Sequence, residues 1–318
     1  MEEIAITGIA GFQIGQAEDK TAATGCTVVI CKDGAVCGVD VRGGSPGTRD
    51  TDALNPVNNR EKVHAVLLAG GSSFGLDAAG GVMQFLEQRK IGRDVGVTVV
   101  PNVCAAILFD LKCGSSNIRP DAQMGLKACE NAFAGKSWQS GNHGAGTGAI
   151  IGTICGGELA MKGGVGAAAF RHGDLCVGAV MAVNCVGDVF DNGKKIAGAR
   201  TPDGKGFVDG ELELLKNFNE NTDVFSDNTL IGCIITNARL TKAQMTKLAS
   251  IGHNGIARAV RPAHTVFDGD TIFAMCTGEV TAALDAVGVL AARAVERAIV
   301  DAVKNAESFD VYPAARDM

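Results

Sequence analysis

The sequence predicts a layered α+β fold. Strand-like and helix-like segments follow one another without the regular strand–helix–strand alternation of a parallel α/β sheet. Glycine is abundant, at 43 of 318 residues, which permits tight turns and close contacts between backbone segments. Trp and Tyr occur once each, so small side chains must fill much of the core. No internal repeat divides the chain, and we expect residues 1–318 to form a single domain.

The first half of the chain is expected to combine short strands with two helices. Residues 27–31 and 35–39 flank Asp33-Gly34, a strong turn signal, which predicts a hairpin. A glycine-rich run, residues 70–75, opens the first helix; it suits a bound anion, although tight strand-to-helix packing explains it more simply. The other elements predicted here are strands at 63–68, 97–100 and 105–108, and helices at 76–88 and 120–134.

In the second half, a buried strand at 175–183 ends at Asn184, and an exposed linker is expected from residue 200 to Asn228. The chain then resumes with a strand that begins at Thr229. The elements predicted after it are helices at 242–251 and from there to 260, a strand at 271–276, and a long amphipathic helix at 280–304.

Composition excludes several classes of function. The net charge is −6 and no basic stripe is present, which argues against nucleic acid and anionic membranes as partners. No apolar stretch is suited to spanning a membrane, and the first residues do not resemble a signal peptide. The 11 cysteines contain no Cys-x-x-Cys, which favours a reducing, cytoplasmic compartment.

No cofactor or metal is expected. The five histidines have no metal-ligand spacing, and no Walker A sequence is present. Gly144, Gly146 and Ala149 formally fit a dinucleotide fingerprint. However, no clear strand precedes them and the following apolar run is interrupted by glycine, so the fit is weak.

Asn228-Thr229 is the strongest candidate for chemistry. If the peptide bond between these residues were cut, Thr229 would carry a hydroxyl and a free α-amine. A threonine hydroxyl is a weak nucleophile that needs an adjacent base, and an N-terminal amine can be that base. The unperturbed pKa of such an amine, about 8, lies near the pH that favours general-base catalysis. An ordinary loop-to-strand junction is the alternative.

Asp268-Gly269-Asp270 is a candidate acid–base pair. Two residues apart in an extended segment, the carboxyl groups point the same way, and Gly269 lets other backbone approach. Two neighbouring carboxylates resist being ionised together, so one of them keeps a proton more readily. A solvated turn before a strand is the alternative explanation.

Five stretches together resemble the self-cleaving N-terminal-nucleophile peptidases and amidases of the DmpA type (peptidase family S58). This family includes β-aminopeptidases and nylon-oligomer hydrolases. The stretches occur in family order and span nearly the whole chain: residues 47–54 (GTRDTDAL), 70–79 (GGSSFGLDAA), 144–148 (GAGTG), 228–229 (NT) and 267–273 (FDGDTIF).

The resemblance implies a four-layer αββα sandwich, shared with ornithine acetyltransferases. It implies self-cleavage into fragments 1–228 and 229–318 that stay associated, and an amide hydrolase that acts on small aminoacyl amides or peptides. A homo-oligomer, by likeness a tetramer, is also implied. The residues implied to form the site are the nucleophile Thr229, its partners Asp268 and Asp270, the oxyanion donor Asn184, and the substrate-pocket residues Phe109, Thr153, Ser72 and Gly146.

Two pocket positions depart from the nylon-oligomer hydrolases. Phe109 stands in place of a tyrosine and Thr153 in place of a lysine, which removes a hydroxyl donor and a cation. The acidic residue that grips the substrate amine in β-aminopeptidases is also missing, with Ala105 or Ala106 in its region. We therefore expect slow self-cleavage, weak activity on nylon-type oligomers, and better activity on short aminoacyl amides or peptides.

Two other functions remain open. An acyltransferase of the ornithine-acetyltransferase type would use the same nucleophile but pass the acyl group to an amine. An unprocessed relative would act as a binding or structural protein. Asn184 has an alternative as well, because an asparagine at the end of a strand can serve simply as a cap.

Overall fold

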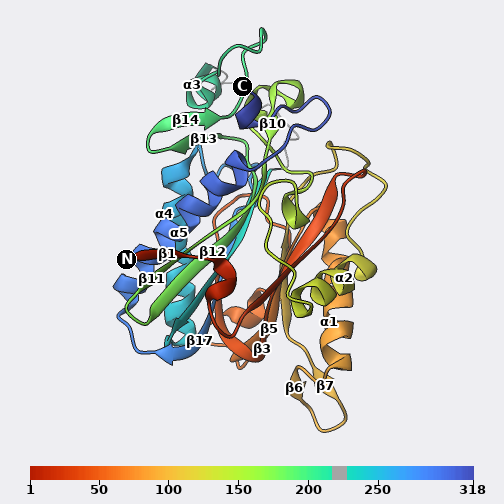
Figure 1. Cartoon of the computed structure of the whole chain (residues 1–318), viewed down its shortest axis with the longest axis vertical. Helices are drawn as coiled ribbons and strands as arrows, with labels where there is room; N and C mark the ends of the chain where they lie inside the picture. The colour runs from red at the N-terminus through yellow and green to blue at the C-terminus, as the bar shows by residue number, and fades with distance from the viewer. Residues whose placement is uncertain (217–227) are drawn as a thin grey trace.

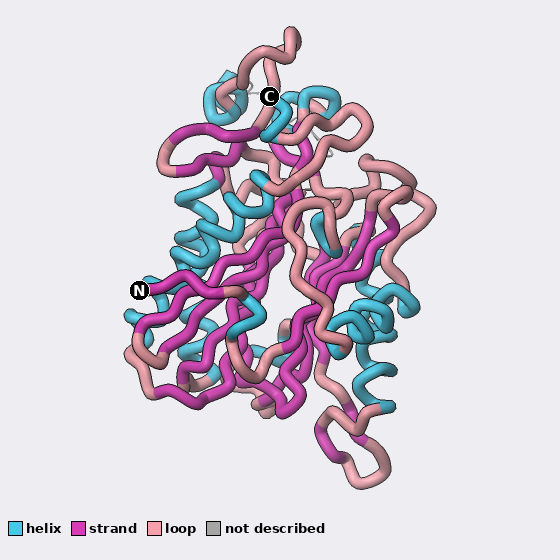
Figure 2. Tube along the Cα trace, viewed as in Figure 1, coloured by secondary structure: helices cyan, strands magenta, loops and turns pink. Residues whose placement is uncertain are grey.

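The computed structural model describes residues 1–216 and 228–318. Its centre is a ten-stranded sheet whose two halves face each other, with helices on the outer side of each half (Figures 1 and 2). The strand order is β1-β11-β12-β15-β17-β3-β5-β8-β4, and β2 pairs with β3. The four-layer αββα arrangement is confirmed. Most of the expected polar linker before Asn228, residues 217–227, lies outside the described residues.

The first sheet half carries helices α4 and α5, and the second carries α1 and α2 (Figure 1). The strands of the first half are β1 (Glu2–Ile4), β11 (Gly164–His172), β12 (Leu175–Asn184), β15 (Thr229–Ala238) and β17 (Thr271–Val280). Those of the second are β2 (Gln13–Asp19), β3 (Thr24–Val41), β4 (Thr48–Arg49), β5 (Lys62–Ala69) and β8 (Val103–Ile107). The helices are α1 (Ala78–Gln88), α2 (Ala122–Phe133), α4 (Lys242–Ala259) and α5 (Leu284–Lys304).

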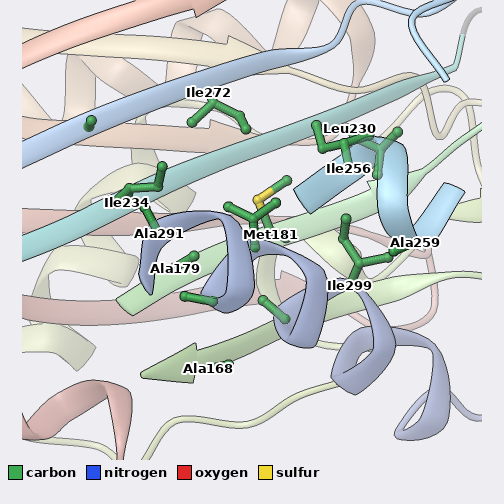
Figure 3. Packing of buried hydrophobic residues seen from close by; sticks show 14 of the residues in the cluster. Ala168, Ala179, Met181, Leu230, Ile234, Ile256, Ala259, Ile272, Ala291 and Ile299 are labelled. Atoms are coloured by element: carbon green, nitrogen blue, oxygen red, sulfur yellow. The ribbon is translucent and has the colours of Figure 1, made fainter. Parts of the chain in front are cut away.

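Alternation along the strands separates three apolar layers. In β15, Leu230 and Ile234 face α4 and α5, whereas Ile231, Cys233 and Ile235 face the opposite sheet half. The helix-facing layer also receives Met181 of β12 and packs against Ile256 and Ile299 (Figure 3). On the far side, the other half of the sheet meets α1 and α2 through a third layer. Both faces of these strands are therefore buried, which explains their nearly continuous apolar sequences.

Strand β3 pairs with strands of both sheet halves. The hairpin predicted at residues 27–39 is wrong. Residues 27–31 and 35–39 do not pair with each other; they belong to one strand, Thr24–Val41, and both parts pair with β5. The pairing register shifts between Ile30 and Ala35, where Gly34 has a φ of +72°. The turn signal therefore marks a bulge, in which glycine supplies the left-handed backbone. The C-terminal part of β3 then pairs with β17.

Three further predicted elements begin or end at other residues in the structure. The two helices expected between residues 242 and 260 are one helix, α4, whose first turn is closed by a capping box between Thr241 and Gln244. The long helix begins at Leu284, because Val280 still pairs with Ala238 at the end of β17. Residues 97–100 contribute only the short, largely exposed strand β7 (Val99–Val100), paired with β6 (Arg93–Asp94).

Several elements were not predicted. Among them are β2 and β11, whose sequences are interrupted by glycine or polar residues. Shorter elements include β9 (Ile150–Ile151), β10 (Met161–Lys162), β13 (Asp188–Asp191), β14 (Lys194–Ala197), β16 (Val260–Arg261) and α3 (Gly210–Lys216). Within residues 1–216 and 228–318, no helix combines the length and the apolar character that crossing a membrane requires.

Candidate active site

Thr229 is the first residue of β15, as predicted, and lies where two neighbouring strands converge. It pairs with Asn184, the last residue of β12, and β15 continues alongside β17 in parallel. Asn228 forms an isolated bridge with Asp268 just before β17 begins. Thr229 and Asn228 are only 4% and 3% exposed. The sheet therefore brings the candidate nucleophile, Asn184 and the Asp268–Asp270 segment together.

The peptide unit before Thr229 is hydrogen-bonded to the Thr229 side chain. The Thr229 hydroxyl donates a hydrogen bond to the carbonyl oxygen of Asn228. The backbone N–H of Gly269 points at the same carbonyl oxygen, at 2.9 Å, and lies 3.2 Å from the Thr229 Oγ1. A donor at this position would stabilise the negative charge that develops on the oxygen when its carbon is attacked.

Asp270 is fully buried and bridges β15 to the loop before β17. Its Oδ1 accepts the N–H of Leu230 at 2.8 Å. Its Oδ2 accepts the N–H of His264 at 3.1 Å and lies 2.7 Å from the His264 Nδ1, which donates to it when Asp270 is ionised. His264 was not singled out as a site residue, because its link to Asp270 depends on a left-handed backbone, φ +60°, that its sequence does not signal.

A second histidine supports His264. The His253 ring packs edge-on against it, with ring centroids 4.8 Å apart. Burial lowers the pKa of His253 to about 4, and its Nε2 lies 3.1 Å from the Asp40 carbonyl. His253 is therefore neutral near pH 7 and adds no positive charge beside Asp270.

Asp268 is suited to proton exchange near neutral pH. It is 1% exposed, and its Oδ2 accepts the N–H and the hydroxyl of Thr265 at 3.0 and 2.6 Å. Burial, reinforced by the neighbouring Asp270, raises the pKa of Asp268 to about 7. These are the physical effects expected for two carboxyl groups in one dry site. The solvated-turn explanation does not fit two carboxyl groups that are buried and fully bonded.

Among the described residues, the side-chain amide of Asn184 has a hydrogen-bonded oxygen and an unpaired nitrogen. Its Oδ1 accepts the N–H of Ile150 at 2.9 Å. Its Nδ2 is buried and makes no hydrogen bond within the described part of the chain. A buried, unpaired donor is costly unless it serves a ligand or a reacting group. The unpaired Nδ2 leaves a donor available, and the oxyanion role of Asn184 stays a prediction.

Thr153 contacts the residue before the nucleophile directly. Its Oγ1 accepts a hydrogen bond from the Asn228 Nδ2 at 2.6 Å, and Thr153 is 6% exposed. It follows the left-handed Gly152 at the start of a short 3₁₀ turn, Thr153–Cys155. Of the four residues predicted to form the substrate pocket, Thr153 is the one that the structure joins to the Asn228–Thr229 unit by a described hydrogen bond.

Ser72 and Phe109 lie together in a neighbouring cluster. The Ser72 N–H donates to the Leu108 carbonyl at 2.9 Å, and Phe109 follows Leu108 directly. The N–H of Gly71 donates to the buried carboxyl of Asp110 at 2.7 Å. The glycine-rich run thus does bind a carboxyl group, but one that belongs to the protein. A role for Ser72 or Phe109 in substrate binding stays a prediction.

Gly146 lies in the segment that positions Asn184. The fully buried ammonium of Lys162 donates to the carbonyls of Gly146, Ala149 and Gly163, at 3.3, 2.7 and 3.2 Å. Ile150, next in the chain, then donates to Asn184. Lys162 was missed because an isolated lysine gives no sequence signal of burial. The segment continues into the two-residue strand β9, not into a helix, so the dinucleotide fingerprint has no structural support.

One wall of the site is built from the loop before β4. The N–H of Ser45 donates to the Asp268 carbonyl at 2.9 Å, and the N–H of Arg42 donates to the Asp270 carbonyl at 2.9 Å. A Cβ at Gly43 would lie 2.2 Å from the Asp268 carbonyl oxygen, so only glycine fits there. The sequence showed a loop rich in turn residues but not its contact with a segment more than 200 residues away.

The cysteine thiols are shielded from solvent to different degrees. Burial raises the pKa of all 11 cysteine thiols, nine of which belong to buried residues. The thiolate is the reactive form, so these thiols are poor nucleophiles. Across the described ranges, no three His, Cys, Asp or Glu side chains gather in a way that could hold a metal ion.

Comparison with known proteins shows the family of the chain. Residues 5–315 match the model of peptidase family S58. An uncharacterized aminopeptidase of Mycobacterium tuberculosis is 38% identical over 348 residues, which cover 98% of this chain and 97% of the relative. A 6-aminohexanoate-oligomer endohydrolase of Agromyces sp. is 31% identical over 280 residues, covering 85% and 74%.

Solved structures show the same fold. A β-aminopeptidase from Burkholderia sp. superposes with a TM-score of 0.68 at 21% identity, covering 95% of this chain and 86% of that one. The L-aminopeptidase D-Ala-esterase/amidase from Ochrobactrum anthropi, described as a variant of the Ntn hydrolase fold, gives 0.69 at 20% identity, covering 98% and 90%. The chain therefore belongs to peptidase family S58 and is a hydrolase of amide or peptide bonds.

Proposed function

We propose that the chain cleaves itself between Asn228 and Thr229 and then uses the free Thr229 to hydrolyse small aminoacyl amides or short peptides. The observation that carries this proposal is the arrangement at one carbonyl group. The Asn228 oxygen receives both the Thr229 hydroxyl and the Gly269 N–H. The fragments would be residues 1–228 and 229–318.

Self-cleavage needs only groups already in place and one water molecule. The Thr229 Oγ1 attacks the Asn228 carbonyl carbon, and the proton that the hydroxyl loses balances the one that the departing nitrogen gains. The carbon–nitrogen bond then breaks, and the departing nitrogen takes up a proton to become the free α-amine of Thr229. Water hydrolyses the resulting ester, which leaves a carboxylate on Asn228 and restores the hydroxyl of Thr229.

Hydrolysis of an external amide would repeat these steps with the new amine as the base. Asp270 fixes β15 at Leu230, next to the nucleophile. Asp268, with its pKa raised to about 7 by burial and by Asp270, can both accept and donate a proton near neutral pH. The free Nδ2 of Asn184 and the N–H of Gly269 would stabilise the oxyanion.

The proposed substrates, compartment and oligomeric state rest on similarity to the relatives. They also rest on the pocket positions Phe109 and Thr153, which differ from the nylon-oligomer hydrolases. The relatives' names refer to aminopeptidases and to a 6-aminohexanoate-oligomer endohydrolase. Without the tyrosine and lysine of the latter group, we expect slow maturation and a preference for short aminoacyl substrates. A cytoplasmic homo-oligomer, by family likeness a tetramer, remains our expectation.

The test is to incubate purified protein with a panel of aminoacyl p-nitroanilides and dipeptide amides. Wild-type protein should release p-nitroaniline, and Thr229→Ala should not. Adding a second amine as acceptor separates hydrolysis from acyl transfer. Free acid as the main product in the presence of acceptor supports the hydrolase, whereas an acylated acceptor favours the transferase. An intact chain that turns over no substrate would contradict the proposal.

A further inference from the structure

The intact chain shows the surroundings of the acyl group that Thr229 would attack in the proposed self-cleavage. In self-cleavage the acyl residue is Asn228, whose carbonyl oxygen faces the Thr229 hydroxyl and the Gly269 N–H. An external substrate attacked by the same Oγ1 must place its carbonyl carbon in the same position. The surroundings of Asn228 therefore describe the pocket for the substrate's acyl residue.

Among the described contacts of Asn228, two bear on that pocket. Its side-chain Nδ2 donates to the Thr153 Oγ1 at 2.6 Å. Its backbone N–H lies 3.4 Å from the Phe267 carbonyl oxygen. In a free aminoacyl substrate, the atom equivalent to this nitrogen is the α-amine, so the Phe267 carbonyl can accept a hydrogen bond from it.

The burial of the pocket restricts which side chains fit. Asn228 and Thr153 are 3% and 6% exposed, so an entering side chain loses its water. Thr153 offers a neutral hydroxyl, which can satisfy an amide but cannot compensate a charge. A leucine of similar shape would leave the Thr153 hydroxyl without the partner that it has in the intact chain.

We propose that the side chain of Asn228 occupies, before cleavage, the subsite that later receives the side chain of the substrate's acyl residue. Thr153 makes this subsite selective for a short, uncharged side chain that forms hydrogen bonds, and asparagine fits best. The substrate class is therefore an α-amino acyl amide of the asparaginyl type. This inference rests on the proposed self-cleavage and amide hydrolysis.

The test compares asparaginyl, leucyl and aspartyl p-nitroanilides on mature wild-type protein, Thr153→Val and Thr153→Ser. Wild type should prefer the asparaginyl substrate over both others. A neutral hydrogen bond contributes about 0.5–1.5 kcal/mol, so Thr153→Val should lower the asparaginyl-to-leucyl ratio of kcat/KM about two- to tenfold. Thr153→Ser keeps the hydroxyl and should retain the preference. An unchanged ratio in Thr153→Val, or a wild-type preference for leucine, overturns the inference.

A second measurement covers variants that mature poorly. Self-cleavage rates are compared for Asn228→Leu, Thr153→Val and the double variant. If the two side chains cooperate, Asn228→Leu slows cleavage in the wild-type background and has a smaller effect in the Thr153→Val background; additive effects overturn the inference. Release of a free Thr229 and turnover of any p-nitroanilide would meanwhile support the proposed function, so the two ideas can fail separately.

Discussion

Asp270 accepts a hydrogen bond from the backbone N–H of Leu230 at 2.8 Å. This bond ties the residue after the nucleophile to a carboxylate whose other oxygen is held by His264. The position of Thr229 thus depends on a loop 35 to 41 residues further along the chain. If the Asn228–Thr229 bond is cut as proposed, this hydrogen bond would keep the start of β15 in place.

His264 should act by positioning Asp270. We predict that His264→Leu lowers kcat about tenfold or more, because a hydrogen bond to a charged group is worth about 1.5–3 kcal/mol. KM should change less, since His264 makes no described contact with the acyl pocket. His264→Asn retains a side-chain donor and should recover part of the loss. Equal kcat values for the Leu and Asn variants, with the fold intact, would contradict this role.

Asp268 should be required for turnover. We predict that Asp268→Asn keeps the fold and reduces the rate by a factor on the order of 10² to 10⁴, as expected when an acid–base group is lost. Asp270→Asn should have an effect of similar size. The measurement is single-turnover hydrolysis of an aminoacyl p-nitroanilide. Normal rates in both variants would remove the pair from the mechanism.

The raised pKa of Asp268 also predicts a pH dependence of stability. Between the ordinary carboxyl pKa of about 4 and about 7, the folded protein keeps a proton here that the unfolded chain releases, so this group's contribution falls as pH rises. Asp268→Asn has no ionisable carboxyl group at this position, so its stability lacks this decrease with rising pH. In the uncleaved Thr229→Ala background, the Asp268→Asn variant should gain unfolding free energy relative to its parent from pH 4 to pH 7. A constant difference between the two denaturation midpoints would show that the pKa is ordinary.

Asn184 should stabilise the oxyanion in both reactions. Asn184→Asp preserves an acceptor for the Ile150 N–H but removes the free donor. We predict that it slows self-cleavage by about 10²- to 10³-fold, the usual cost of losing one oxyanion donor. The readout is the fraction of cleaved chain over time after purification. Cleavage at the wild-type rate would mean that Nδ2 does not face the reacting carbonyl.

The sequence predicted the parts of the fold that depend on local pattern. Strand β15 was identified because its apolar run begins sharply at Thr229, and the Asp268–Asp270 pair because of its spacing. The hairpin prediction was wrong because Asp33-Gly34 suits a bulge as well as a turn, and only pairing with β5 distinguishes them.

The remainder of the site depends on contacts between distant segments. Ser45 reaches Asp268 across more than 200 residues, and Lys162 stabilises the segment that holds Asn184. No sequence motif around either residue indicates its role. The left-handed backbone that turns His264 toward Asp270 is likewise set by the surrounding loop.

Thr229 should become a free N-terminus, and intact mass with N-terminal sequencing of the purified protein measures this outcome. We predict two fragments from the 32.6 kDa chain, one of which begins at Thr229, while Thr229→Ala gives a single folded chain. Slow cleavage would appear as a mixture that shifts toward the fragments with time. A fully active protein that stays one chain beginning at Met1 would contradict catalysis by a free Thr229.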